Sequence, residues 1–196
     1  MMHKYRSVAD MVAVDKEGWL RGRTVRQIPC ANHNDRPEGT AIDSLVIHCI
    51  SLPERNHDPK LPIDLFLNRI DPQEYPKLAP LNKLKVSAHF MIDRAGIVMQ
   101  FVSVLDRAWH AGVSSGMGRT DFNDFSIGVE LIGDVYSPYT PLQLSSLSNL
   151  IHVLRQRYPL KYAFAHSEIA PFRKQDPGQF FPWSRFRKAH NFELDM

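Results

Sequence analysis

A chain of 196 residues, 43% hydrophobic and 23% charged, has the size and balance of one globular domain with a sizeable core. Its net charge of +3 is small and its Lys and Arg residues are scattered, which argues against a nucleic-acid-binding protein. No apolar run approaches the ~20 residues that cross a bilayer, and the N-terminal stretch lacks the apolar core of a signal peptide, which argues against membrane insertion and export.

The first part of the chain contains one clear strand and one long excursion. Residues 1–18 show no clear periodicity, and we expect a loosely ordered leader before a domain at residues 19–192. The apolar, β-branched run "SLVIHCI" (44–50) is typical of a buried strand. Residues 54–85 are rich in proline and charge around a predicted short helix at 62–70, and their length favours a functional excursion over a tight connection.

A hairpin and a second apolar strand follow. Residues 87–92 and 97–102 read as strands on either side of a turn, in which Gly96 is able to take the positive φ that such turns require. The run "FSIGVELI" (125–132) is mostly apolar, which predicts a strand in the centre of a sheet.

The last part of the chain predicts two helices around a short strand. Thr140 as N-cap, Pro141 in the first turn and Gln143 completing a capping box begin an amphipathic helix. A strand at 162–167 and a helix at 183–190 come after it. The order of strand, excursion, hairpin, strand, helix, strand and helix predicts a single α/β domain with a central mixed sheet flanked by helices.

Three residues suggest a metal site. His48 lies inside the first strand, His166 follows at the end of the last strand, and Asp176 is on the next loop. Two imidazoles and one carboxylate are the ligands of a catalytic zinc whose fourth position is open to water. From spacing alone, each histidine also fits a hydrogen-bonded core residue, and Asp176 before Pro177 also fits the start of a turn.

The two cysteines, Cys30 and Cys49, are interpreted as structural thiols. Because no export signal is present, a reduced compartment and therefore a cytoplasmic protein is expected. Strand alternation predicts that Cys49 points to the opposite face from His48.

Five segments in the order "VIHCISLP", "VSAHF", "RAWHAGVSS", "NDFSIGVELIG" and "HSEIAPFRKQDPG" resemble the AmpD-type 1,6-anhydro-N-acetylmuramoyl-L-alanine amidases. This zinc amidase family shares its fold with peptidoglycan-recognition proteins, and the resemblance covers about residues 18–190. It implies zinc at one end of a mixed sheet flanked by helices. The implied zinc ligands are His48, His166 and Asp176. Cys49 departs from the asparagine that these sequences carry after the first zinc histidine.

The resemblance also implies an activity with assigned roles. The reaction is hydrolysis of the amide between (1,6-anhydro-)N-acetylmuramic acid and L-alanine in small muropeptides during peptidoglycan recycling. Glu130 is then the general base and acid, and Lys174 stabilises the developing oxyanion. Without the resemblance, Glu130 fits equally well as a partnered strand-end carboxylate, and Lys174 as a solvated loop lysine. We expect the apolar strand around Glu130 to raise its pKa.

Trp109 and His110 are candidates for the substrate pocket, with the indole face against a sugar ring and the imidazole as a hydrogen-bonding group. A core tryptophan is the alternative for Trp109. Two other functions remain open: an amidase acting on intact peptidoglycan, and a non-catalytic muropeptide-binding module. The presence of all candidate ligands and of both catalytic candidates argues against the binding module.

Overall fold

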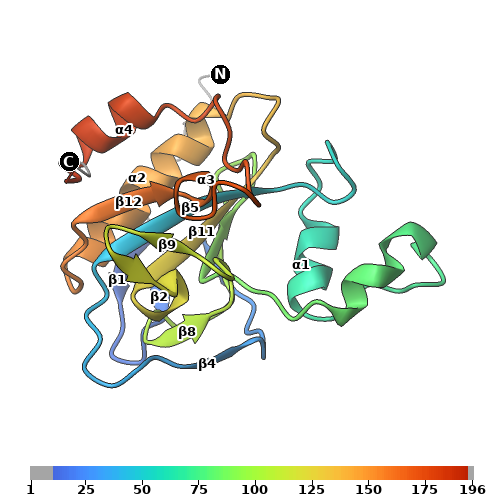
Figure 1. Cartoon of the computed structure of the whole chain (residues 1–196), viewed down its shortest axis with the longest axis horizontal. Coiled ribbons are helices and arrows are strands. Elements are labelled where there is room, and N and C mark those ends of the chain that lie inside the picture. Colours follow the sequence, from blue (N-terminus) through green and yellow to red (C-terminus); the bar gives the residue numbers. More distant parts are fainter. Residues whose placement is uncertain (1–10, 194–196) are drawn as a thin grey trace.

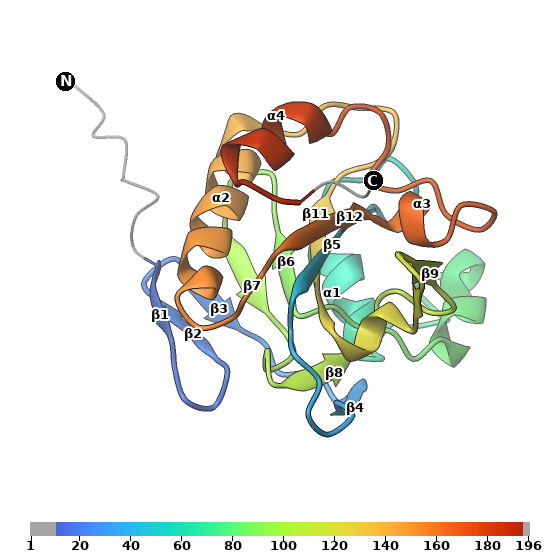
Figure 2. The same ribbon diagram turned by 60° about the vertical axis from the view of Figure 1, so that its left-hand side comes forward.

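A six-stranded mixed sheet forms the centre of the protein. The structure is a computed structural model that describes residues 11–193. Its strands are β3 (Val25–Gln27), β5 (Ser44–Ile50), β6 (Phe90–Ile92), β7 (Val98–Gln100), β11 (Ser126–Ile132) and β12 (Tyr162–Ala165). They follow the spatial order β12-β5-β11-β6-β7-β3, and all neighbours are parallel except the β6–β7 hairpin (Figure 1 and Figure 2). The predicted mixed sheet and the central place of the strand at 125–132 are confirmed.

Helix α2 (Pro141–Arg155) covers one face of the sheet, and α4 (Trp183–Ala189) lies next to it (Figure 2). The predicted capping box is present: Thr140 Oγ1 accepts from the Gln143 N–H, and the Thr140 N–H donates to Gln143 Oε1, both at 3.1 Å. The buried side of α2 packs on the strand residues that point to this face. The resulting core cluster includes Leu45, Ile47, Ile127, Val129, Leu131, Leu147, Leu150, Ile151 and Leu154.

The two cysteines are free thiols within apolar surroundings. Cys49 packs against the cluster under α2, which confirms that its side chain lies on the opposite face from His48. Burial raises the pKa of Cys49 to about 12, and burial also raises the pKa of Cys30. Both side chains are therefore thiols at neutral pH and act as small apolar residues.

The opposite face of the sheet is covered by short elements and loops. The 3-10 helix η2 (Phe122–Asp124) and helix α3 (His166–Ile169) contribute to a second cluster on this face. Its members are Val46, Ala111, Phe122, Phe125, Phe164 and Ile169. His48, two residues after Val46 on β5, points to this same face.

The excursion at 54–85 contains helix α1 (Lys60–Phe66) and the 3-10 helix η1 (Pro76–Lys83), and it extends to one side of the sheet (Figure 1). Helix α1 is shifted from the predicted range of 62–70. It ends early because Asn68 has a φ of 56°, the left-handed conformation that commonly follows a helix C-terminus. An apolar cluster that includes Leu65, Phe66, Met91, Met99 and Phe101 holds the excursion against the β6–β7 hairpin.

Three small two-stranded sheets were not predicted, because strands of two to four residues carry too little periodic signal. They pair β1 (Met11–Val14) with β2 (Leu20–Gly22), β4 (His33–Asp35) with β8 (Asp106–Ala108), and β9 (Ser115–Gly116) with β10 (Arg119–Thr120). Strand β1 falls within the predicted leader, so regular structure begins before residue 19. Residues 1–10 of that leader lie outside the described residues.

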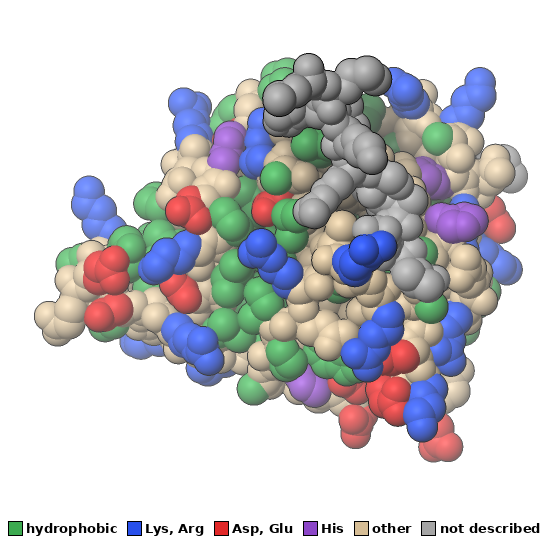
Figure 3. All heavy atoms as spheres, turned by 180° about the vertical axis from the view of Figure 1, so that it is seen from behind, with side chains coloured by type: hydrophobic (Ala, Val, Ile, Leu, Met, Phe, Trp, Pro, Cys, Tyr) green, Lys and Arg blue, Asp and Glu red, His purple; other side chains and the backbone are tan. Residues whose placement is uncertain are grey.

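The surface seen in Figure 3 carries Lys and Arg side chains dispersed among acidic and apolar ones. This distribution agrees with the scattered basic residues in the sequence. Within residues 11–193, no helix has both the length and the apolar character needed to cross a membrane.

Candidate functional site

The side chains of His48, His166 and Asp176 meet at one end of the sheet. The Nδ1 atoms of the two histidines lie 2.9 Å apart. Asp176 Oδ2 lies 3.2 Å from Nδ1 of His48 and 3.0 Å from Nδ1 of His166. Three potential ligand atoms therefore face one common point, as the sequence analysis predicted for these residues.

Parallel pairing of β5 with β12 brings the histidines together. Ala165, the last residue of β12, is in register with Ile47, and in each case the following residue of the chain is a histidine. His166 is not in the strand, however, because helix α3 begins there. The Glu168 carboxylate starts this turn by accepting the N–H of Ala165 at 2.7 Å, and Arg187 holds the same carboxylate.

The loop that carries Asp176 is fixed at two backbone positions. The carbonyl of Asp176 accepts the N–H of Ser167 at 3.0 Å. The next carbonyl, that of Pro177, accepts the hydroxyl of the buried Tyr139 at 2.7 Å. These bonds tie the loop to α3 on one side and to the segment before α2 on the other, which holds the carboxylate in place. This role of Tyr139 in holding the loop was not predicted from the sequence.

The three side chains fit a zinc ion by donor type, number and spacing. Zinc–nitrogen distances of about 2.0 Å at tetrahedral angles place neighbouring donors about 3.3 Å apart, slightly more than the spacings here. His166 Nε2 donates to the carbonyl of Ala111 at 3.0 Å, because a carbonyl can only accept. The lone pair of His166 is therefore on Nδ1, which faces the other two ligands, as in other zinc sites.

The protonation states also suit metal binding. Burial lowers the pKa of His48 to about 4, against the opposing effect of its hydrogen bond with Asp176. Burial acts to raise the pKa of Asp176, but hydrogen bonds with His166 and His48 outweigh it and hold this pKa well below its usual value. At neutral pH the site thus offers a neutral imidazole at His48 and an ionised carboxylate, the forms that bind metals.

Glu130 lies next to this cluster. It is in register with His48 across the parallel strands β11 and β5, so the two side chains project from the same face of the sheet. Its Oε2 atom is buried and has no hydrogen-bond partner within residues 11–193. Burial, and to a lesser extent the charge of Asp176, raise the pKa of Glu130 to about 8, against the lowering effect of the charge on Lys174. The carboxyl can therefore exchange a proton near neutral pH.

Lys174 is half-buried on the loop between α3 and Asp176. Its positive charge lowers the pKa of both Glu130 and His48, although in each case burial has the larger effect. The ammonium group is therefore close enough to act electrostatically on the cluster. This position agrees with the role that the sequence analysis gave to Lys174, which stays a prediction.

Trp109 and His110 follow strand β8 and have different surroundings. The indole N–H of the partly exposed Trp109 donates to Asn34 Oδ1 at 2.6 Å. His110 Nδ1 lies 3.0 Å from His48 Nε2, and burial lowers the pKa of His110 well below its usual value, so its ring is neutral. The contact between His110 and His48 was not predicted from the sequence. The predicted role of both residues in substrate binding stays a prediction.

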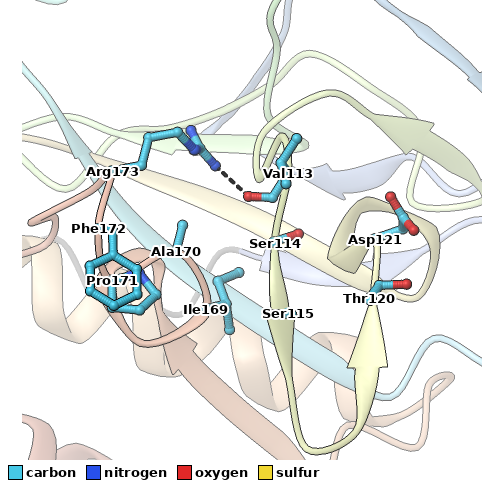
Figure 4. A pocket seen from close by; sticks show the side chains of 10 residues that line it. All are labelled: Val113, Ser114, Ser115, Thr120, Asp121, Ile169, Ala170, Pro171, Phe172 and Arg173. Carbon is cyan, nitrogen blue, oxygen red and sulfur yellow. Dashed lines mark hydrogen bonds between the residues drawn. The ribbon is translucent and has the colours of Figure 1, made fainter.

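A cavity of about 620 Å³ opens between the segment 113–121 and the loop after α3 (Figure 4). Arg173 on its edge donates to the carbonyls of Ala111 and Val113, both at 2.7 Å. The carbonyl of Ala111 is also the partner of His166. The ring of Phe172 is fully exposed at this cavity, so a ligand there would meet an apolar wall.

Residues 38–179 match a family described as N-acetylmuramoyl-L-alanine amidase, and this range includes every residue of the cluster. The chain is 42% identical over 174 residues to the 1,6-anhydro-N-acetylmuramyl-L-alanine amidase AmpD of Escherichia coli K12, which covers 88% of this chain and 94% of that protein. The match therefore extends over nearly the whole length of both proteins.

Solved structures give the same relationship. A crystal structure of a selenomethionine derivative of AmpD superposes with a TM-score of 0.81 at 42% identity, covering 90% of this chain and 98% of the other. E. coli AmiD, in complex with anhydro-N-acetylmuramic acid-L-Ala-D-γ-Glu-L-Lys, matches with a TM-score of 0.60 at 26% identity over 92% of this chain and 66% of AmiD. Drosophila peptidoglycan recognition protein SA shares the fold, with a TM-score of 0.60 at 18% identity over 88% of this chain and 95% of that chain. The chain therefore belongs to the N-acetylmuramoyl-L-alanine amidase family and is an AmpD-type amidase within it.

Proposed function

We propose that this amidase is a zinc-dependent hydrolase that acts on small muropeptides in peptidoglycan recycling. It cleaves the amide between 1,6-anhydro-N-acetylmuramic acid and L-alanine. The observation that carries this proposal is the meeting of His48, His166 and Asp176 beside a buried carboxyl that has no hydrogen-bond partner in the described chain. The names of its relatives and the anhydromuropeptide bound to AmiD support the choice of substrate.

His48, His166 and Asp176 would hold the zinc, which when bound would supply Lewis acidity toward the amide carbonyl and a water with its pKa lowered to about 7. Glu130 moves the protons. Its free Oε2 atom accepts a proton from the water whose oxygen adds to the carbonyl carbon. The same carboxyl then donates this proton to the alanine nitrogen as the C–N bond breaks. The products are the lactyl carboxylic acid and a peptide with a free amine.

Lys174 acts on charge rather than on protons in this proposal. As the water oxygen adds to the amide, negative charge develops on the carbonyl oxygen. A fixed ammonium group near that oxygen stabilises the transition state more than the neutral ground state. The electrostatic effect of Lys174 on Glu130 and His48 supports its presence within reach.

Substrate contacts are proposed for Trp109 and for the cavity at 113–121. The partly exposed indole offers an apolar face of the kind that packs against a sugar ring. We place the reaction in the cytoplasm, because the free thiols Cys30 and Cys49 suit a reducing compartment.

The decisive experiment is mass spectrometry of the products formed from a defined 1,6-anhydro-N-acetylmuramoyl peptide. The expected products are the free anhydro sugar and the intact peptide with an L-alanine N-terminus. Polymeric peptidoglycan is tested in parallel. Faster release of peptide from the polymer than from the anhydromuropeptide would favour the amidase of intact wall, and binding without any cleavage would favour a binding module.

A further inference from the structure

We propose that His110 is a positioning residue, which fixes the orientation and tautomer of His48 so that Nδ1 of His48 faces the metal position. This inference rests on the proposed function, in which His48 is a metal ligand. His48 is 1% exposed, and its Nδ1 atom belongs to the ligand cluster. Its second nitrogen, Nε2, lies 3.0 Å from Nδ1 of His110, with the two rings nearly perpendicular at 80°.

The direction of these hydrogen bonds follows from the group farthest from the metal position, which is the carbonyl of Phe122. The carbonyl of Phe122 can only accept, so the hydroxyl of Ser126 donates to it. Ser126 Oγ lies 3.3 Å from His110 Nε2 and has used its only proton. It therefore accepts the proton on Nε2 of His110. Of the two facing nitrogens one must donate and the other accept, so the His110 ring, with its proton on Nε2, accepts at Nδ1 the proton on Nε2 of His48. The lone pair of His48 is left on Nδ1.

The fold is built to hold the ring of His110 in this place. Gly128 in strand β11 lies directly under the ring, and a Cβ atom there would come within 2.4 Å of His110 Cγ. The backbone is clamped as well, because the N–H groups of His110 and Ala111 both donate to Asn123 Oδ1, at 3.1 and 2.8 Å. Neither support involves the metal ligands, so both are independent of the contact with His48.

Adjacent residues thus serve the two histidine ligands. The side chain of His110 accepts from His48, and the carbonyl of Ala111 accepts from His166. Outer partners of this kind orient a ligand, fix its tautomer and increase its basicity. Both ring nitrogens of His110 are engaged in this arrangement.

The test compares two variants of nearly equal shape, His110→Asn and His110→Leu. Asn places a carbonyl oxygen close to the position of Nδ1 and still accepts from His48, whereas Leu does not accept. Zinc affinity is measured on the full chain by competition with a chelator of known affinity. We expect His110→Leu to weaken zinc binding by about 10–100-fold, and His110→Asn to recover most of this loss. The exposed His152 supplies the control, since His152→Ala should bind zinc as the wild type does.

The zinc affinities of wild type and variant distinguish a failure of this inference from a failure of the proposed function. Wild-type protein that binds no zinc would overturn the proposed function. Wild-type protein that binds zinc, together with a His110→Leu variant of equal affinity, would overturn only the role of His110. Circular dichroism of the metal-free variants checks folding, and equal zinc loss in the Asn and Leu variants would indicate a merely structural role.

Ser126→Ala gives a second route if His110→Leu does not fold. The hydroxyl that accepts from His110 Nε2 is then missing, so the tautomer of His110 is no longer fixed. We expect weaker zinc binding in the same direction as for His110→Leu. Unchanged affinity in this variant would contradict the proposed direction of the hydrogen bonds.

Discussion

Glu130 and His48 are paired residue to residue across the parallel strands β11 and β5. This register places a candidate proton-transfer group and a candidate metal ligand next to each other on two neighbouring strands of the central sheet. Side chains on neighbouring central strands keep their separation more accurately than side chains on loops. The separation of Glu130 and His48 is therefore set by the strand pairing.

Replacing Glu130 by Gln is expected to lower kcat by about 10²–10⁴, because the amide cannot accept the water proton or return it. Zinc content should stay at the wild-type level, since Glu130 is not among the three converging ligands. Steady-state kinetics and elemental analysis measure the two quantities. The exposed Glu38 offers a matched control as Glu38→Gln. Turnover close to wild type in Glu130→Gln would remove this residue from the mechanism.

The raised pKa of Glu130 predicts a pH-dependent stability of the metal-free protein. Its pKa rises from 4.5 to about 8 on folding, so the folded state binds the proton more tightly than the unfolded state does. The stabilising contribution of the neutral carboxyl is complete below pH 4.5 and is lost as the pH rises through 8. Relative to Glu130→Gln, wild type should therefore lose stability between pH 5 and pH 8. Urea unfolding of both proteins at several pH values tests this, and parallel curves would contradict it.

Removal of the metal is expected to abolish turnover, and added zinc is expected to restore it. Zinc at about one hundred times its Kd adds about 2.7 kcal/mol of stability. For a chain of this size, this raises Tm by roughly 5–10 °C, at ~2–4 °C per kcal/mol. The variant Asp176→Asn lacks one charged ligand and should show neither the restored activity nor the full rise in Tm. Full activity after exhaustive chelation would contradict zinc catalysis.

Lys174→Met should lower kcat by about 10²–10³, the usual effect of losing one group that stabilises an oxyanion. The same change removes the charge that lowers the pKa of Glu130, so the pH profile should shift toward higher pH. Rates measured from pH 5 to pH 9 report both effects. Lys188→Met, at an exposed position on α4, is the control. A reduced kcat with an unshifted pH profile would indicate that Lys174 contributes to turnover without lowering the pKa of Glu130.

The sequence predicts the elements with strong local signals. The run 44–50 is mostly apolar and coincides with β5, and the capping box at Thr140 and Gln143 marks the start of α2. These signals depend on neighbouring residues alone. The pairing of β12 with β5, which brings His166 to His48, is a long-range property that no local pattern specifies. For the site residues, the resemblance to a family supplied what periodicity does not.

The contact between His110 and His48 is likewise a long-range property that local sequence patterns do not predict. It depends on the space above Gly128, which lies on β11, a strand separated from His110 in the sequence. One signal was nevertheless present, because a glycine inside an otherwise apolar strand often marks the close approach of another group. The short strands β4 and β8, which come before His110, gave no comparable signal.

The shared carbonyl of Ala111 has a consequence for protein engineering. Arg173 at the cavity and His166 in the ligand cluster both donate to this one oxygen. A designer who transplants the three ligands to a different sheet therefore needs to carry the His110–Ala111 dipeptide with them. An insertion or deletion that displaces this dipeptide would disturb both imidazoles and the cavity edge at once.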